Sequence, residues 1–104
     1  MKKQKWVNPK TDKLFKAVLK LENLDEARRF FRDLLTEQEI EEFASRWEVA
    51  RMLAKKIPYS KIEKETGMSS TTIARISKWL NGGMGGYQLL IKKFGNQVNH
   101  HSPA

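Results

Sequence analysis

Short hydroxyl and basic side chains gather between Ser69 and Lys78, and their chemistry suits a nucleic acid. Serine and threonine hydroxyls reach base edges or phosphates without crowding, and alanine and threonine methyl groups can contact the thymine methyl in a major groove. Arginine and lysine add the positive charge that attracts phosphate. No acidic residue lies between Thr66 and the C-terminus, where it would repel phosphate. This run is therefore a candidate surface for reading a double helix.

Two short helices joined by a tight turn are expected to position this run. Ser60-x-x-Glu63 matches a capping box and predicts the start of a first helix. That helix is expected to end at Gly67, because glycine adopts a left-handed backbone at no steric cost. Ser69 is then expected to cap a second helix over residues 70–80.

The apolar residues of these two helices favour a helix-turn-helix. Ile62 lies on the first helix, Met68 is expected to be buried in the turn, and Ile73 with either Ile76 or Ala74 would face the first helix. The alternative is an ordinary corner in a helical bundle, where the serine and threonine at the helix start serve only as a cap. In the helix-turn-helix register the outward residues are Ser70, Thr71, Ala74, Arg75 and Lys78.

The charge of the chain favours a polyanionic partner. The formal net charge is +8, which predicts attraction to nucleic acid or to an anionic membrane. Residues 1–20 carry seven lysines against one aspartate, and residues 55–104 carry eight basic residues against two glutamates. Pattern and charge together favour double-stranded DNA. The candidate DNA contacts, in a helix-turn-helix at about residues 59–80, are Ser60, Lys61, Lys64, Ser69, Ser70, Thr71, Thr72, Ala74, Arg75 and Lys78.

The sequence offers few of the groups that enzymes use. It has no cysteine, and its two histidines are His100 and His101, so a Ser/His/Asp triad and cysteine-based zinc sites are excluded. The two histidines could bind a stray metal ion or be incidental. A glutamate cluster over residues 37–42 suits the positive end of a helix better than acid–base catalysis, and the glycine-rich residues 82–86 suit a hinge better than a phosphate loop. We expect no catalytic residue, metal site or cofactor.

Helical spacing predicts one all-α domain over residues 1–95, followed by a loose polar tail over residues 96–104. Thr11, behind Asn8-Pro9, is expected to cap a first helix, and Asp25 a second. A lysine-rich start up to Lys5 could be an arm that touches DNA or a frayed end. No apolar run exceeds three residues, so we expect no membrane segment and a cytoplasmic protein.

Thr36-x-x-Glu39 matches a second capping box and predicts a long third helix. Its apolar stripe runs to Ile57, and Pro58 is expected to stop it, because a residue before proline is disfavoured in the α region. A last short helix is expected over residues 87–94.

Several short motifs along the chain occur together in one known family. They are Leu35-Thr36 with Glu39, Ser45-Arg46, Tyr59-Ser60-x-Ile62, Glu65-x-Gly67, Thr72-Ile73-Ala74-Arg75, Leu80-Asn81-Gly82-Gly83 and Gly85-Gly86-Tyr87. By these motifs residues 35–80 resemble the tryptophan repressor family, and the whole chain resembles a little-characterised bacterial branch of Trp repressor-like proteins. The resemblance implies an intertwined homodimer, with two recognition helices about one duplex turn apart on a palindromic site. A heavy apolar load in the first 57 residues agrees with this.

The resemblance also implies a candidate ligand site. Thr36, Arg46 and Arg75 match the residues that hold tryptophan in repressors of this family. Ile76 and Trp79 replace a glycine and a serine there, so the pocket is expected to be plugged and tryptophan is not expected to be the corepressor. Arg75 would then be free for DNA.

Arg46 is alternatively expected to pair with Glu42, one turn earlier on the same helix. Whether any small-molecule effector binds stays open.

The sequence therefore predicts a bacterial, sequence-specific DNA-binding transcriptional regulator that acts as a homodimer and is not an enzyme. One alternative is a helical protein-interaction module that binds an acidic partner through the same basic face. Another is a metabolite-responsive repressor.

Overall fold

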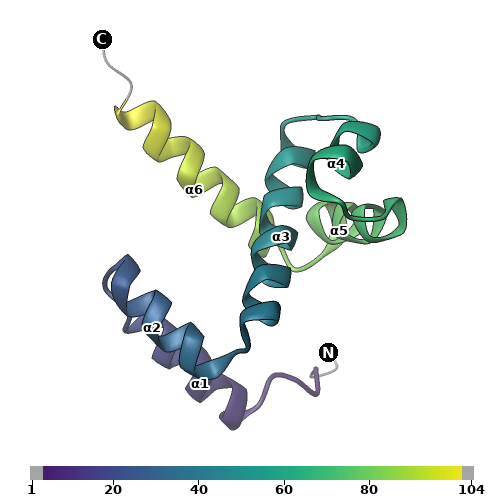
Figure 1. Ribbon diagram of the computed structural model, residues 1–104. Helices are drawn as coiled ribbons and strands as arrows, with labels where there is room; N and C mark the ends of the chain where they lie inside the picture. The colour runs from purple at the N-terminus through teal and green to yellow at the C-terminus, as the bar shows by residue number, and fades with distance from the viewer. Residues whose placement is uncertain (1–3, 102–104) are drawn as a thin grey trace. The chain divides into compact units, whose positions relative to one another are not determined.

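The computed structural model describes the backbone of residues 4–101 and the side chains of residues 4–95 (Figure 1). Every regular element in this part of the chain is an α-helix, which confirms the all-α prediction. The chain divides into two compact units, and the division falls after Ile40. The first contains α1 (Pro9–Leu19), α2 (Leu24–Leu34) and the start of α3 (Glu37–Ala54), and the second contains the rest of α3, α4 (Tyr59–Thr66), α5 (Ser70–Gly82) and α6 (Gly86–His101).

Asparagines cap the first two helices. The Asn8 Oδ1 accepts from the Thr11 N–H at 2.9 Å, and the Thr11 Oγ1 accepts from the Asn8 N–H at 3.1 Å, so Thr11 is the third helical residue and not the cap. The expected cap was wrong because Pro9, with its fixed φ, suits the first helical position. Likewise Asn23 and not Asp25 caps α2, by accepting from the Glu26 N–H at 2.9 Å.

The first unit buries little of its apolar surface. Neither α1 nor α2 contains a buried residue. The rings of Trp6 and Phe15 meet edge to face with centroids 6.3 Å apart, yet both side chains are exposed. Leu19 is 82% exposed, and Leu34 is also exposed. The first unit therefore leaves an apolar surface that its own residues do not cover.

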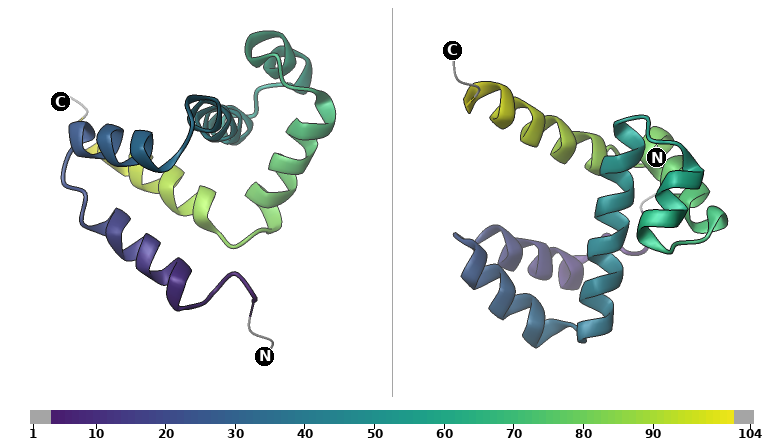
Figure 2. Two further views of the ribbon diagram at one scale, coloured as in Figure 1. Left: turned by 60° about the horizontal axis from the view of Figure 1, so that its bottom comes forward. Right: turned by 45° about the horizontal axis from the view of Figure 1, so that its top comes forward.

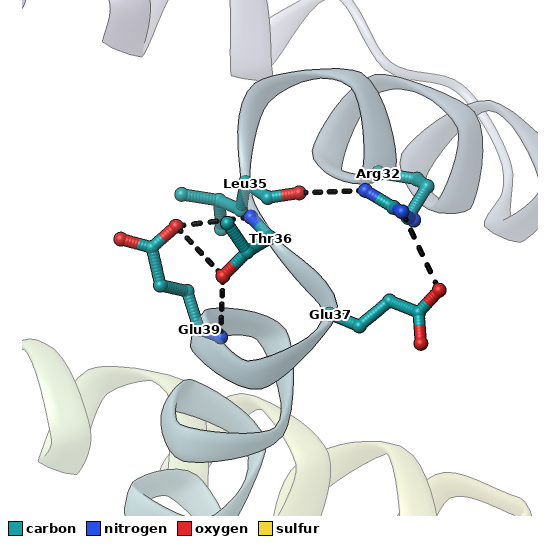
Figure 3. Close-up of polar contacts among 5 residues, drawn as sticks. All are labelled: Arg32, Leu35, Thr36, Glu37 and Glu39. Atoms are coloured by element: carbon teal, nitrogen blue, oxygen red, sulfur yellow. Dashed lines mark hydrogen bonds and ion pairs between the residues drawn. The ribbon is translucent and has the colours of Figure 1, made fainter.

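A capping box opens α3, as predicted (Figure 3). The Thr36 Oγ1 accepts from the Glu39 N–H at 3.1 Å, and the Glu39 Oε1 accepts from the Thr36 N–H at 2.9 Å. Arg32 supports the same junction, because its guanidinium donates to the Leu35 carbonyl and to the Glu37 carboxylate. The junction between α2 and α3 is thus held by local hydrogen bonds.

The end of α3 differs from the prediction. The helix ends at Ala54, three residues before Ile57. Lys56 has a φ of 65°, and its N–H donates to the Leu53 carbonyl at 2.9 Å. The Ile57 N–H donates to the Met52 carbonyl at 3.1 Å, which completes a Schellman motif. Ile57 keeps its apolar role, because it packs against the core after the chain has turned.

The core of the second unit lies among α3, α4 and α5, whose order can be followed in Figure 2. Its buried side chains are Val49, Ala50, Met52, Ile62, Ile73 and Ile76. No helix in the described part of the chain is long and apolar enough to cross a membrane.

The last helix, α6, is tied to both α3 and α5. The Trp47 ring stacks on Tyr87 at 6.3 Å between centroids and lies 6.1 Å from the Phe94 ring. The Gln88 Nε2 donates to the Leu80 carbonyl at 2.6 Å. The helix runs to His101, so the predicted end at residue 94 is wrong, whereas the loose tail over residues 96–104 stays a prediction. Residues 102–104 lie outside the described part of the chain.

Candidate nucleic-acid interface

A tight turn joins α4 to α5 and forms the predicted helix-turn-helix. Gly67 has a φ of 76° and caps α4, with its N–H donating to the Glu63 carbonyl at 2.8 Å. A left-handed backbone of this kind favours glycine. Met68 packs partly buried against the core, and its N–H donates to the Thr66 Oγ1 at 3.2 Å. The turn is therefore fixed by backbone geometry, by hydrogen bonds and by one apolar anchor.

The two helices begin differently. The Ser69 Oγ accepts from the Thr72 N–H at 3.2 Å, so Ser69 caps α5 as predicted. The capping box predicted at Ser60 is wrong, because Pro58 is the cap residue of α4 and makes no side-chain hydrogen bond there. Proline pre-sets the backbone at the helix entry, and this places Ser60 within the first turn.

The outward face of α5 is open to solvent. Its inward residues, Ile73 and Ile76, are buried in the core, and Ala74 is exposed, so Ile76 supplies the second inward contact. Thr72 is half-buried and its backbone N–H is held by the cap. The exposed candidate DNA contacts on this helix are Ser70, Thr71, Ala74, Arg75 and Lys78.

The candidate contacts of α4 share one hollow. Ser60, Lys61 and Lys64 line it together with Glu65. The sequence prediction did not include Glu65, whose carboxylate offsets part of the positive charge of the two lysines. The two lysines are exposed and so remain able to meet a phosphate.

The three candidate ligand residues make different contacts within the chain. The Thr36 hydroxyl belongs to the capping box of α3. The Arg46 guanidinium lies 5.5 Å from the centroid of the Phe43 ring, a cation–π contact, and the predicted pair with Glu42 is not formed. Arg75 is exposed on α5.

The two residues expected to fill the ligand pocket, Ile76 and Trp79, differ in their burial. Ile76 is 1% exposed and belongs to the core. Trp79 is 44% exposed, because it sits at the margin of α5 beside Gly83, Met84 and Tyr87. The expectation that Ile76 and Trp79 together plug a ligand pocket therefore stays a prediction.

A further hollow lies beside the C-terminal half of α5, and the sequence prediction missed it. Lys56 and Tyr59 line it from the corner between α3 and α4, and Ser77 and Asn81 line it from α5. The spacing of Ser77 and Asn81 places them on one helix face. Nothing in the sequence indicates that Lys56 has a left-handed backbone or that it lies near them.

Within the described residues, no three histidine, cysteine, aspartate or glutamate side chains gather in a way that could hold a metal ion. The candidate contacts on the helix-turn-helix are hydroxyl, methyl and cationic groups, with the Glu65 carboxylate beside the two lysines of α4.

Fold and site together define an all-α helix-turn-helix protein, and comparisons with known proteins give the family. The Trp repressor protein family matches residues 9–94. The chain belongs to this family.

Similar proteins come from several bacteria. The chain is 46% identical over 82 residues to the uncharacterized protein YerC of Bacillus subtilis (strain 168), covering 79% of each chain. A crystal structure of a TrpR-like protein from Eubacterium eligens ATCC 27750 matches with a TM-score of 0.84 and 40% identity, over 88% of this chain and 94% of that one. A Trp repressor candidate from Staphylococcus aureus matches with a TM-score of 0.84 and 36% identity, over 91% and 95%. Family and fold indicate a DNA-binding regulator.

Proposed function

We propose that this protein is a sequence-specific transcriptional regulator of bacteria that binds double-stranded DNA as a homodimer, without tryptophan as corepressor. The observation that carries the proposal is the exposed face of α5, where hydroxyl, methyl and cationic groups stand free of acidic neighbours on the same helix. In the major groove, Ser70, Thr71 and Ala74 would meet base edges. Lys61, Lys64 and Lys78 would meet phosphates on either side.

The uncovered surface of the first unit supports the homodimer. Exposed apolar residues on α1 and α2 lose contact with water when a second copy covers them, and burial contributes about 25 cal/mol per Å² of apolar area. A two-fold symmetric dimer presents two copies of α5, which suits a palindromic site.

The exclusion of tryptophan rests on two observations. Ile76 fills core space beside Arg75, where related repressors have a glycine. The Thr36 hydroxyl is engaged in the capping box of α3. We therefore expect the affinity for DNA to be the same with and without free tryptophan.

Selection of bound duplexes from a random pool tests the proposal. The wild-type protein should enrich one palindromic or near-palindromic motif. Thr71→Ala should change the preference at one position by about 1 to 3 kcal/mol, and Arg75→Ala should cost a similar amount of binding free energy. Arg28→Ala, which removes the same charge from an exposed site on α2, is the matched control and should leave the motif unchanged. Recovery of no motif by the wild-type protein would instead favour a protein-interaction module with an acidic partner.

A further inference from the structure

The hollow at the corner between α3 and α4 is lined by four polar and four apolar residues. Its volume is about 300 Å³. Its polar lining residues are Lys56, Tyr59, Ser77 and Asn81, the Asn81 Nδ2 being engaged by Ser77, and no acidic residue lines it. Such a set of cationic and hydroxyl donors matches an anion with several acceptor oxygens.

The Ser77 hydroxyl accepts a hydrogen bond and keeps its own hydrogen. The Asn81 Nδ2 donates to the Ser77 carbonyl at 2.9 Å and to the Ser77 Oγ at 3.3 Å. Because the Ser77 Oγ already accepts a hydrogen bond, its own hydrogen is left to point toward another acceptor.

Lys56 reaches this hollow from an unfavourable backbone position. Among the described residues it is the one non-glycine residue with a positive φ, at 65°, where glycine would meet no steric cost. A conformation of this kind persists where the surroundings enforce it, and it is a pointer to function. Here the Schellman motif enforces it, and the lysine adds a charge that glycine could not supply.

The hollow continues the candidate DNA surface. Ser77 and Asn81 lie on the same side of α5 as Ser70 and Ala74, since these residues are separated by three or four positions. Asn81 lies roughly 16 Å along the helix from Ser70, at 1.5 Å per residue. The major groove is about 12 Å wide, so a helix that reads bases near Ser70 reaches the flanking backbone by its C-terminal end.

We infer that this hollow binds a phosphate of the DNA backbone, with Lys56 as its cation and Ser77 and Tyr59 as neutral donors. The inference rests on the proposed function and extends its interface from α5 and α4 to the corner that follows α3. It makes Lys56 a binding residue.

The salt dependence of DNA affinity tests the assignment. The probe is the duplex recovered by selection, titrated with the full chain from 0.05 to 0.3 M salt. Lys56→Asn keeps the left-handed backbone accessible but removes the charge. Because a homodimer would lose two such lysines, it should lower the slope of log affinity against log salt by about 1.8, which is roughly a thirtyfold loss of affinity at 0.15 M salt. Lys56→Arg should retain the wild-type slope, and Ser77→Ala should lower affinity with the slope unchanged.

The charge-matched control is Lys93→Gln, an exposed site on α6 outside the interface, which should keep the wild-type slope. A wild-type slope in Lys56→Asn, in a protein that binds the duplex, overturns the phosphate site and leaves the proposed function standing. A wild-type protein that binds no duplex at any salt overturns both. Circular dichroism identifies any variant that has not folded, and Tyr59→Phe, which removes only a hydroxyl, then supplies the second measurement through a loss of affinity.

Discussion

A lysine in a left-handed conformation follows the end of α3, although glycine is the residue that such a position favours. The hydrogen bonds of Lys56 and Ile57 to the preceding turn hold the backbone there. Residue types alone give no signal for this, because lysine is common in the last turn of a helix and its φ becomes positive only through the geometry of the Schellman motif. The sequence therefore predicted that α3 would stop near Pro58 but not where or how.

Lys56→Gly should stabilise the protein. A non-glycine residue in the left-handed region costs about 1 to 2 kcal/mol, and the greater freedom of glycine in the unfolded chain returns about 0.4 to 1 kcal/mol of that. The net gain should be about 0.5 to 1 kcal/mol in the free energy of unfolding, measured by urea denaturation. The control Lys55→Gly, at a neighbour with a negative φ, should give no gain. A destabilised Lys56→Gly would show that the lysine side chain contributes more to folding than its backbone costs. If the phosphate assignment holds, Lys56→Gly combines greater stability with weaker DNA binding.

At the scale of the elements, helix periodicity predicted where helices lie better than where they begin. The apolar spacing of α5 placed Ile73 and Ile76 inward and the hydroxyl face outward, as the structure has them. Where a helix starts depends on which of several neighbouring polar residues takes the N-cap position. Asn8 and Asn23 are the N-cap residues here, and Thr11 and Asp25 are not. The hollow with Lys56 could not be predicted, since its lining residues are about twenty positions apart in the sequence and are brought together only by the tertiary fold.

Two neighbouring glycines at the C-terminal end of α5, Gly82 and Gly83, have opposite requirements. A Cβ on Gly83 would lie 2.5 Å from the Trp79 carbonyl oxygen, whereas a Cβ on Gly82 would meet nothing within 4 Å. Gly83→Ala should therefore destabilise the protein by about 1 to 3 kcal/mol, because the backbone must shift. Gly82→Ala, at the last residue of α5, should stabilise it by up to about 1 kcal/mol. Thermal unfolding of both variants measures the difference, and equal effects would show that the connection between α5 and α6 adapts freely.

At the scale of the whole molecule, the two units differ in how much apolar surface they bury. The second unit has a core formed by three helices, whereas α1 and α2 of the first bury no residue. An amphipathic helix is stable in water mainly because its apolar face is packed. The many apolar residues before position 57 indicated that this part of the chain has more apolar surface than it can bury. The sequence of one chain does not show which other surface covers those residues. A second copy of the chain is the partner that the proposed function supplies.

If two copies fold together, stability must depend on protein concentration. Because a dimer dissociates as it unfolds, each tenfold increase in concentration adds about 1.4 kcal/mol. For a dimer of this size that corresponds to a rise of about 3 °C in the unfolding midpoint, which calorimetry over a hundredfold concentration range can detect.

Leu34→Glu places a charge on the exposed apolar face of α2 and should lower the midpoint and shift the sedimentation coefficient toward the monomer. Gln38→Glu adds the same charge at an exposed polar site in the first turn of α3, where a carboxylate is favourable, and should neither lower the midpoint nor shift the sedimentation coefficient. A midpoint independent of concentration, with a monomeric sedimentation coefficient, would contradict the homodimer and with it the two-fold symmetry expected of the DNA site.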